Sequence, residues 1–137
     1  TTVGNMRLVG ENLDRLSNGD FQANISQEME GDYTVLKDAT NSLGKYLNFL
    51  IEDSNTMNEA AKVGELDVRI DANKYQGDFE RIINSINDTS EMNTDILNTI
   101  RTTLESFVEN NIDSRINNVD YRGDFLNISN SINSNLQ

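Results

Sequence analysis

The sequence predicts an all-α protein of similar helical units in series, and three observations support this prediction. A Gly-Asp-aromatic triplet occurs three times, beginning at Gly31, Gly77 and Gly123, with a constant spacing of 46 residues. Apolar residues between the triplets recur at three and four positions, which is the 3.5-residue stripe of a coiled-coil helix. The chain also has no Pro, the residue that interrupts long helices. A regular period of this length indicates a tandem array.

The apolar stripes predict two long helices, over residues 33–63 and 79–109, each about 45 Å long at 1.5 Å per residue. Shorter stripes predict partial helices over residues 3–17 and 125–137. An asparagine stands ten residues after each triplet glycine, at Asn41, Asn87 and Asn133. The stripe positions that begin each helix after a triplet are expected in the bundle core: Leu36, Phe79, Ile82, Ile86, Phe125, Ile128 and Ile132.

The helix boundaries are predicted from residues that favour the two ends of a helix. Aspartate suits the N-cap, where its carboxylate accepts backbone N–H bonds, and Gly or Asn suits the left-handed turn that follows the last helical residue. The expected N-caps are Asp32, Asp78 and Asp124, and the expected turn residues are Gly19, Gly64 and Asn110. The stretches 20–31, 65–77 and 111–123 are then connectors, read as extended segments packed on the helices.

Some stripe positions are polar, including Thr89, Asn93 and Thr103 on the second long helix. A seam of this kind buries less apolar area and is expected to be marginal. Two interpretations stay open at this point: an imperfection that the fold tolerates, or a bundle that is bistable by design.

Composition excludes several classes of function. The chain lacks Cys and His, so it has no thiolate nucleophile, no disulfide and none of the commonest general bases or transition-metal ligands. Its net charge of −12, from 23 acidic and 11 basic residues, argues against nucleic-acid binding. We therefore expect no enzyme activity, cofactor, metal or small-molecule ligand. No apolar run is long enough to span a membrane, and the patterned ends suggest a fragment of a longer chain.

The order of these elements resembles the HAMP domain, a linker found in histidine kinases, adenylate cyclases, phosphatases and methyl-accepting chemoreceptors. The run from Gly64 to Ile70 is similar to the family's Gly-x-Leu-x-x-Arg-Ile connector start, and the helix with its Asn near the tenth position matches the family's second helix. Three departures exist: Gly-Asp-aromatic replaces Asp-Glu, the early Pro is absent, and Asn110 replaces Gly. The apolar pairs that match the family's connector anchors are Phe21 and Ile25, Leu66 and Ile70, and Ile112 and Ile116.

The resemblance implies three concatenated HAMP-like repeats, over residues 1–46, 47–92 and 93–137, with long helices shared between repeats. It implies a parallel four-helix coiled-coil bundle formed by two copies of the chain. Helices with narrow stripes cannot hide both seams within one chain, whereas two copies can. The implied partners are a second copy, in a parallel homodimer, and the flanking sensory and output domains of the same chain.

The implied function is a signal-transducing linker that relays a conformational change to an output domain in a bacterial transmembrane or soluble receptor. A methyl-accepting chemotaxis protein is favoured as the parent, with a sensor histidine kinase as the alternative, and the expected location is cytoplasmic. The rival function is a structural dimerising coiled-coil spacer. A spacer favours a uniform apolar seam, whereas a relay needs connectors and tolerates a polar seam.

Overall fold

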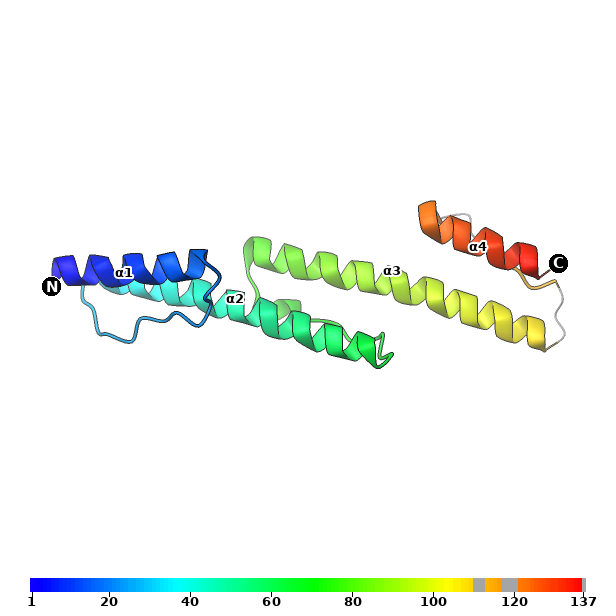
Figure 1. Cartoon of the computed structure of the whole chain (residues 1–137), viewed down its shortest axis with the longest axis horizontal. Coiled ribbons are helices and arrows are strands. Elements are labelled where there is room, and N and C mark those ends of the chain that lie inside the picture. Colours follow the sequence, from blue (N-terminus) through cyan, green and yellow to red (C-terminus); the bar gives the residue numbers. More distant parts are fainter. Residues whose placement is uncertain (110–112, 117–120, 137) are drawn as a thin grey trace. The chain divides into compact units, whose positions relative to one another are not determined.

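The structure, a computed structural model, describes residues 1–109, 113–116 and 121–136. These residues form helices joined by connectors, and no strand is found among them, which confirms the all-α prediction. The elements, in chain order, are α1 (Thr2–Ser17), α2 (Asp32–Lys62), the short 3-10 helix η1 (Ala72–Lys74), α3 (Gly77–Val108) and α4 (Gly123–Asn135) (Figure 1).

The two long helices agree with the predicted ranges to within two residues at each end. Each runs without interruption because its 3.5-residue pattern keeps one register from end to end and it contains no Pro. The helix η1 was not predicted. It begins where the Asp71 carboxylate accepts a hydrogen bond from the backbone N–H of Asn73 at 3.0 Å, a local turn that the sequence pattern of the connector did not reveal.

The first two helices end in the same hydrogen-bonded turn. Gly19 and Gly64 each stand two residues beyond the last helical residue, with φ of 90° and 82°. After α1, the N–H groups of Gly19 and Asp20 donate to the carbonyls of Leu16 and Arg15, at 3.0 and 2.9 Å. This is a Schellman motif, which requires a left-handed residue at the glycine position. The third expected turn residue, Asn110, lies outside the described residues.

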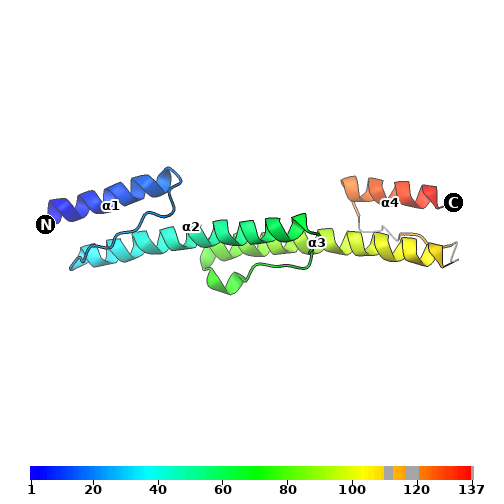
Figure 2. The same ribbon diagram turned by 60° about the horizontal axis from the view of Figure 1, so that its bottom comes forward.

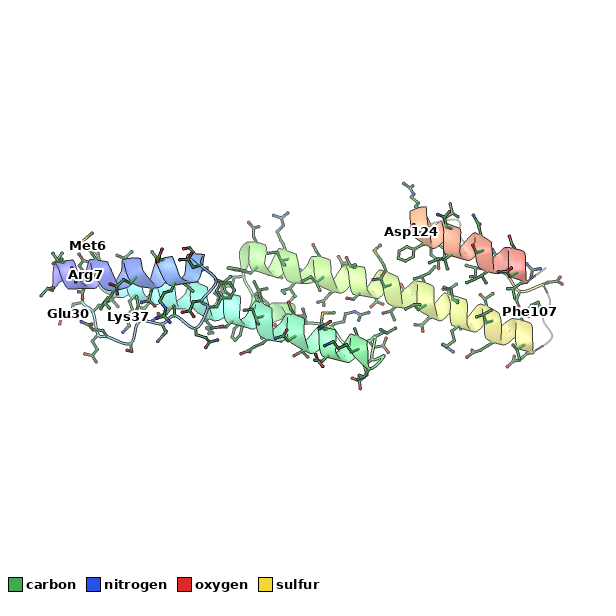
Figure 3. The ribbon with its side chains drawn as sticks, viewed as in Figure 1. Met6, Arg7, Glu30, Lys37, Phe107 and Asp124 are labelled. Atoms are coloured by element: carbon green, nitrogen blue, oxygen red, sulfur yellow. The ribbon has the colours of Figure 1, made fainter. Side chains whose placement is uncertain are left out.

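The prediction that aspartates form the helix N-caps needs correction. Asp32, Asp78 and Asp124 lie inside the first helical turn, and the N-cap positions of α2 and α4 are Gly31 and Arg122, without a side-chain capping bond. The triplet glycines adopt positive φ and turn the chain sharply, so each helix begins one or two residues earlier than the predicted boundary. The aspartates still lie at the positive end of each helix dipole, where a negative charge is favourable, and Asp124 is seen at the start of α4 (Figure 3).

The chain forms two compact parts, Thr1–Arg81 and Ile82–Gln137. In the N-terminal part, α1 and the first half of α2 lie side by side and run in the same direction, with the connector returning along them (Figure 1 and Figure 2). In the C-terminal part, α4 runs in the same direction as the adjacent end of α3. Parallel neighbouring helices require a long return connector, which explains why each connector spans about a dozen residues.

One small core of the N-terminal part lies between α1, the first half of α2 and the first connector. Val9 and Leu16 of α1 are buried there together with Ala23 and Ile25 of the connector. Gly44 lets the connector approach α2 closely, because a Cβ atom at this position would lie 3.3 Å from the Ala23 carbonyl oxygen. The local packing therefore depends on the absence of a side chain in the middle of a helix.

The predicted bundle core is not buried within the single chain. Leu36 is 46 % exposed, and Ile82 and Ile128 are exposed to a similar degree. The remaining four predicted core residues are only half-buried: Phe79, Ile86, Phe125 and Ile132. The apolar stripes of the long helices are therefore partly exposed in the single chain.

Candidate functional site

The connectors are the candidate functional site, because they are the segments that distinguish this chain from a plain coiled coil. The second apolar anchor of each connector is buried: Ile25, Ile70 and Ile116. The first anchor is less covered, since Phe21 is half-buried and Leu66 is 40 % exposed. Ile112, the first anchor of the third connector, lies outside the described residues.

An asparagine of the following helix holds the first connector at its buried anchor. The Asn41 Oδ1 atom accepts a hydrogen bond from the Ile25 N–H at 2.8 Å, and its Nδ2 donates to the Ile25 carbonyl at 3.0 Å. The side-chain amide thus pairs with both backbone groups of one residue, as a neighbouring strand would. Buried backbone N–H and C=O groups require partners, and an extended segment lying on helices has no strand to supply them.

The same arrangement occurs in the third connector. The Ile116 N–H donates to Asn133 Oδ1 at 2.8 Å, and Asn133 Nδ2 donates to the Ile116 carbonyl at 3.1 Å. Two connectors that are far apart in the sequence therefore use one device, which we name the asparagine clamp. The recurrence of Asn41, Asn87 and Asn133 was visible in the sequence, but sequence reasoning did not assign these residues a role.

A further asparagine holds the start of the first connector. Asn48 Nδ2 donates to the carbonyl of Phe21 at 2.5 Å, and its Oδ1 accepts from Gln22 Nε2 at 2.9 Å. Asn48 lies two helical turns beyond Asn41 on α2. The first connector is thus bound to α2 at both of its apolar anchors.

A second polar cluster joins the second connector to α2, and sequence reasoning missed it. Asp53 of α2 accepts a hydrogen bond from the Tyr75 hydroxyl at 2.5 Å and from Lys74 Nζ at 2.9 Å. The Lys74 ammonium also lies over the Phe49 ring, 5.2 Å from its centroid. Tyr75 is only 3 % exposed, and its ring packs edge-on against Phe49 with centroids 6.2 Å apart. We call Asp53, Lys74 and Tyr75 the connector cluster.

The connector cluster changes the proton affinity of its members. Burial alone would raise the pKa of Asp53, but the hydrogen bonds from Lys74 and Tyr75 and the Lys74 charge outweigh it, so the pKa lies below 3.8. Burial, followed by the hydrogen bond to Asp53 and the negative charges of Asp53 and Glu52, raises the pKa of Tyr75 beyond its ordinary value. Asp53 therefore stays ionised and Tyr75 stays protonated near neutral pH.

The polar side chains at the connectors form hydrogen bonds and an ion pair that hold the connectors in position on the helices. In the part of the chain that the structure describes, no group of three or more acidic side chains is arranged to hold a metal ion. None of the described helices combines the length and the hydropathy that a membrane crossing requires. What the connectors do offer is a set of directional bonds that couple extended segments to particular points on helices.

Comparison with known proteins gives one family. A family model described as the HAMP domain matches residues 2–49 and 74–137, well over half of the chain. None of the curated proteins compared with the chain matches it. The matched ranges include both asparagine clamps and the buried anchors of the first and third connectors.

We predict that Asn41→Ala lowers the free energy of unfolding by about 1–3 kcal/mol, because the buried N–H and carbonyl of Ile25 lose their partners. The control is Asn55→Ala, an exposed residue of the same helix. It is expected to be neutral or to gain up to about 0.7 kcal/mol from helix propensity. Urea denaturation at one protein concentration measures both. Equal effects of the two substitutions would contradict the clamp.

We also predict that the contribution of Asp53 depends on pH. Its folded-state pKa is lowered, so its stabilisation is present above the ordinary value of 3.8 and is lost as pH falls through the folded-state pKa. The difference in melting temperature between the unmodified chain and Asp53→Asn should therefore be largest near neutral pH and shrink below about pH 4. Lys74, Tyr75 and Glu52 are the ionisable groups around Asp53. A difference that stays constant with pH would show that the ionised carboxylate is not what stabilises the cluster.

Proposed function

The chain belongs to the HAMP domain family, whose members are signal-transducing linkers of receptors, and we propose that it relays a conformational change between flanking input and output domains. One observation carries this proposal. The single helix α2 is bound to two successive connectors, to the first through Asn41 and to the second through Asp53. The two residues lie about 18 Å apart along an unbroken helix. A displacement of α2 must therefore reach both connectors.

The proposed assembly is a parallel homodimer of three concatenated HAMP-like repeats, each repeat forming a four-helix bundle with its copy. The exposed apolar residues support it, because they recur seven residues apart on three helices: Met6 and Leu13, Leu36 and Leu43, and Leu97 and Leu104. This is the spacing of a coiled-coil seam. Met6, for example, projects from α1 and is largely exposed in the single chain (Figure 3).

The polar residues of the stripe fit the same proposal. Thr103, which lies on the stripe of α3, and Thr40 of α2 are buried, and each hydroxyl donates to the carbonyl four residues earlier in its own helix, at 2.8 and 2.7 Å. These hydroxyls are satisfied without a partner on another helix. They therefore impose no single pairing between helices, as a bundle that changes its packing requires.

We further propose that the parent is a bacterial receptor of the methyl-accepting chemotaxis type, with this segment in the cytoplasm. A linker of a sensor histidine kinase is the alternative within the same family. The connectors argue against the alternative function of a passive spacer. A spacer needs neither buried connector anchors nor side-chain amides that clamp the connector backbone.

We predict that Leu36→Ser weakens dimerisation, because it removes an apolar side chain from the proposed seam. Val35→Ser is the matched control, since Val35 is adjacent, is 67 % exposed and lies off the stripe. Sedimentation across a dilution series should show the Leu36 variant dissociating at a concentration about tenfold or more higher, with the control unchanged. A chain that is folded and monomeric at every concentration would rule out the four-helix assembly.

We predict that helical phase controls signalling. Seven residues inserted between Met92 and Leu97 of α3 keep the 3.5-residue stripe in register, whereas two inserted residues turn the downstream stripe by about 200°. In a receptor that contains this segment, the seven-residue insertion should preserve the response and the two-residue insertion should abolish or invert it. Equal tolerance of both insertions would favour the spacer.

A further inference from the structure

We propose that the connector cluster is a latch that fixes the end of the second connector, and through it the start of α3, to the middle of α2. The latch distinguishes the junction between the first two repeats from the other connectors of the chain. A signalling role for the latch rests on the proposed relay. The attachment of the second connector to α2 can be measured without any receptor response.

The latch has a directional part and an apolar part. The Asp53 carboxylate receives two donors from adjacent residues, the Tyr75 hydroxyl and the Lys74 ammonium. Hydrogen bonds to a charged acceptor are stronger than those between neutral groups. Tyr75 and Asp53 are both largely shielded from solvent, which further strengthens a bond between them. The backbone at residues 74 and 75 is thus held at one point on α2.

The aromatic rings extend this attachment to α3. Tyr46 of α2 stacks on Phe79, with ring centroids 5.5 Å apart, and it also lies 6.4 Å from the Tyr75 ring. Phe79 belongs to the first turn of α3. One short stretch of α2, from Tyr46 to Asp53, therefore contacts both the last residues of the connector and the helix that follows.

The other repeats cannot build this latch. In the first repeat, Lys74 and Tyr75 correspond to Glu28 and Met29, 46 positions earlier, so the phenol is replaced by a thioether. Asp53 stands eleven residues before Gly64 and corresponds to Leu8, eleven residues before Gly19, so the carboxylate is replaced by an apolar side chain. The residues 46 positions after Asp53, Lys74 and Tyr75 are Thr99, Asp120 and Tyr121, so the phenol is kept but the carboxylate and the lysine are lost. The helices and connectors thus recur in every repeat of the sequence, whereas the latch residues occur together only at the second connector.

Hydrogen–deuterium exchange on the whole 137-residue chain tests the latch. Tyr75→Phe removes only the hydroxyl and keeps the ring contacts. We expect amides of residues 65–75 to exchange about tenfold faster in this variant, because local opening of the second connector becomes easier. Exchange in residues 20–31 should stay unchanged. Tyr121→Phe is the matched control, since its repeat position lacks the carboxylate, and it should leave the second connector as it was.

A double-mutant cycle with Asp53→Asn completes the test. If the hydroxyl acts through the carboxylate, Tyr75→Phe should add little to the exchange rate in the Asp53→Asn background. The latch is refuted if Tyr75→Phe leaves exchange of residues 65–75 unchanged, if it accelerates residues 20–31 equally, or if the two substitutions are additive. The insertions in α3 test the relay separately, so the latch can fail while the relay stands, and the reverse.

Discussion

An extended connector that lies on helices must satisfy its backbone polar groups without a neighbouring strand, and the rest of the structure depends on how it does so. Asn41 and Asn133 solve this problem in the same way, each pairing with the N–H and carbonyl of a buried isoleucine. The clamp lets the connector bury its apolar anchor without leaving unpaired groups. It also fixes the connector to a defined turn of the helix that follows, so the parallel order of the helices is maintained.

In the proposed assembly each long helix belongs to two neighbouring repeats, and this sharing has an energetic consequence. Helix α2 uses one stretch for the first connector and another for the second, while its Leu36 and Leu43 face outward in the single chain. A helix whose stripe is left open gains stability from a second copy, so folding and assembly are coupled in the proposed dimer. Because a shared helix is rigid, the proposed relay would transmit a signal as a rotation or tilt of that helix.

The first two connectors are attached to α2 by different contacts among the described residues. The first is bound at both anchors by Asn41 and Asn48, and the second ends in the cluster of Asp53, Lys74 and Tyr75. Because these contacts differ, a force applied along α2 is expected to open these two connectors unequally.

The sequence by itself determined the helices, because the 3.5-residue stripe, the glycine turns and the lack of Pro are local signals that repeat every 46 residues. It also pointed to the buried anchors Ile25, Ile70 and Ile116, whose spacing recurs. It misplaced the N-caps by one or two residues, since the positive φ of the triplet glycines is set by the folded turn. Only the tertiary structure decided which side chains hold the connectors. Asn41 meets Ile25 and Asp53 meets Tyr75 across 16 and 22 residues, and such pairings depend on how helices and connectors pack, which no local pattern encodes.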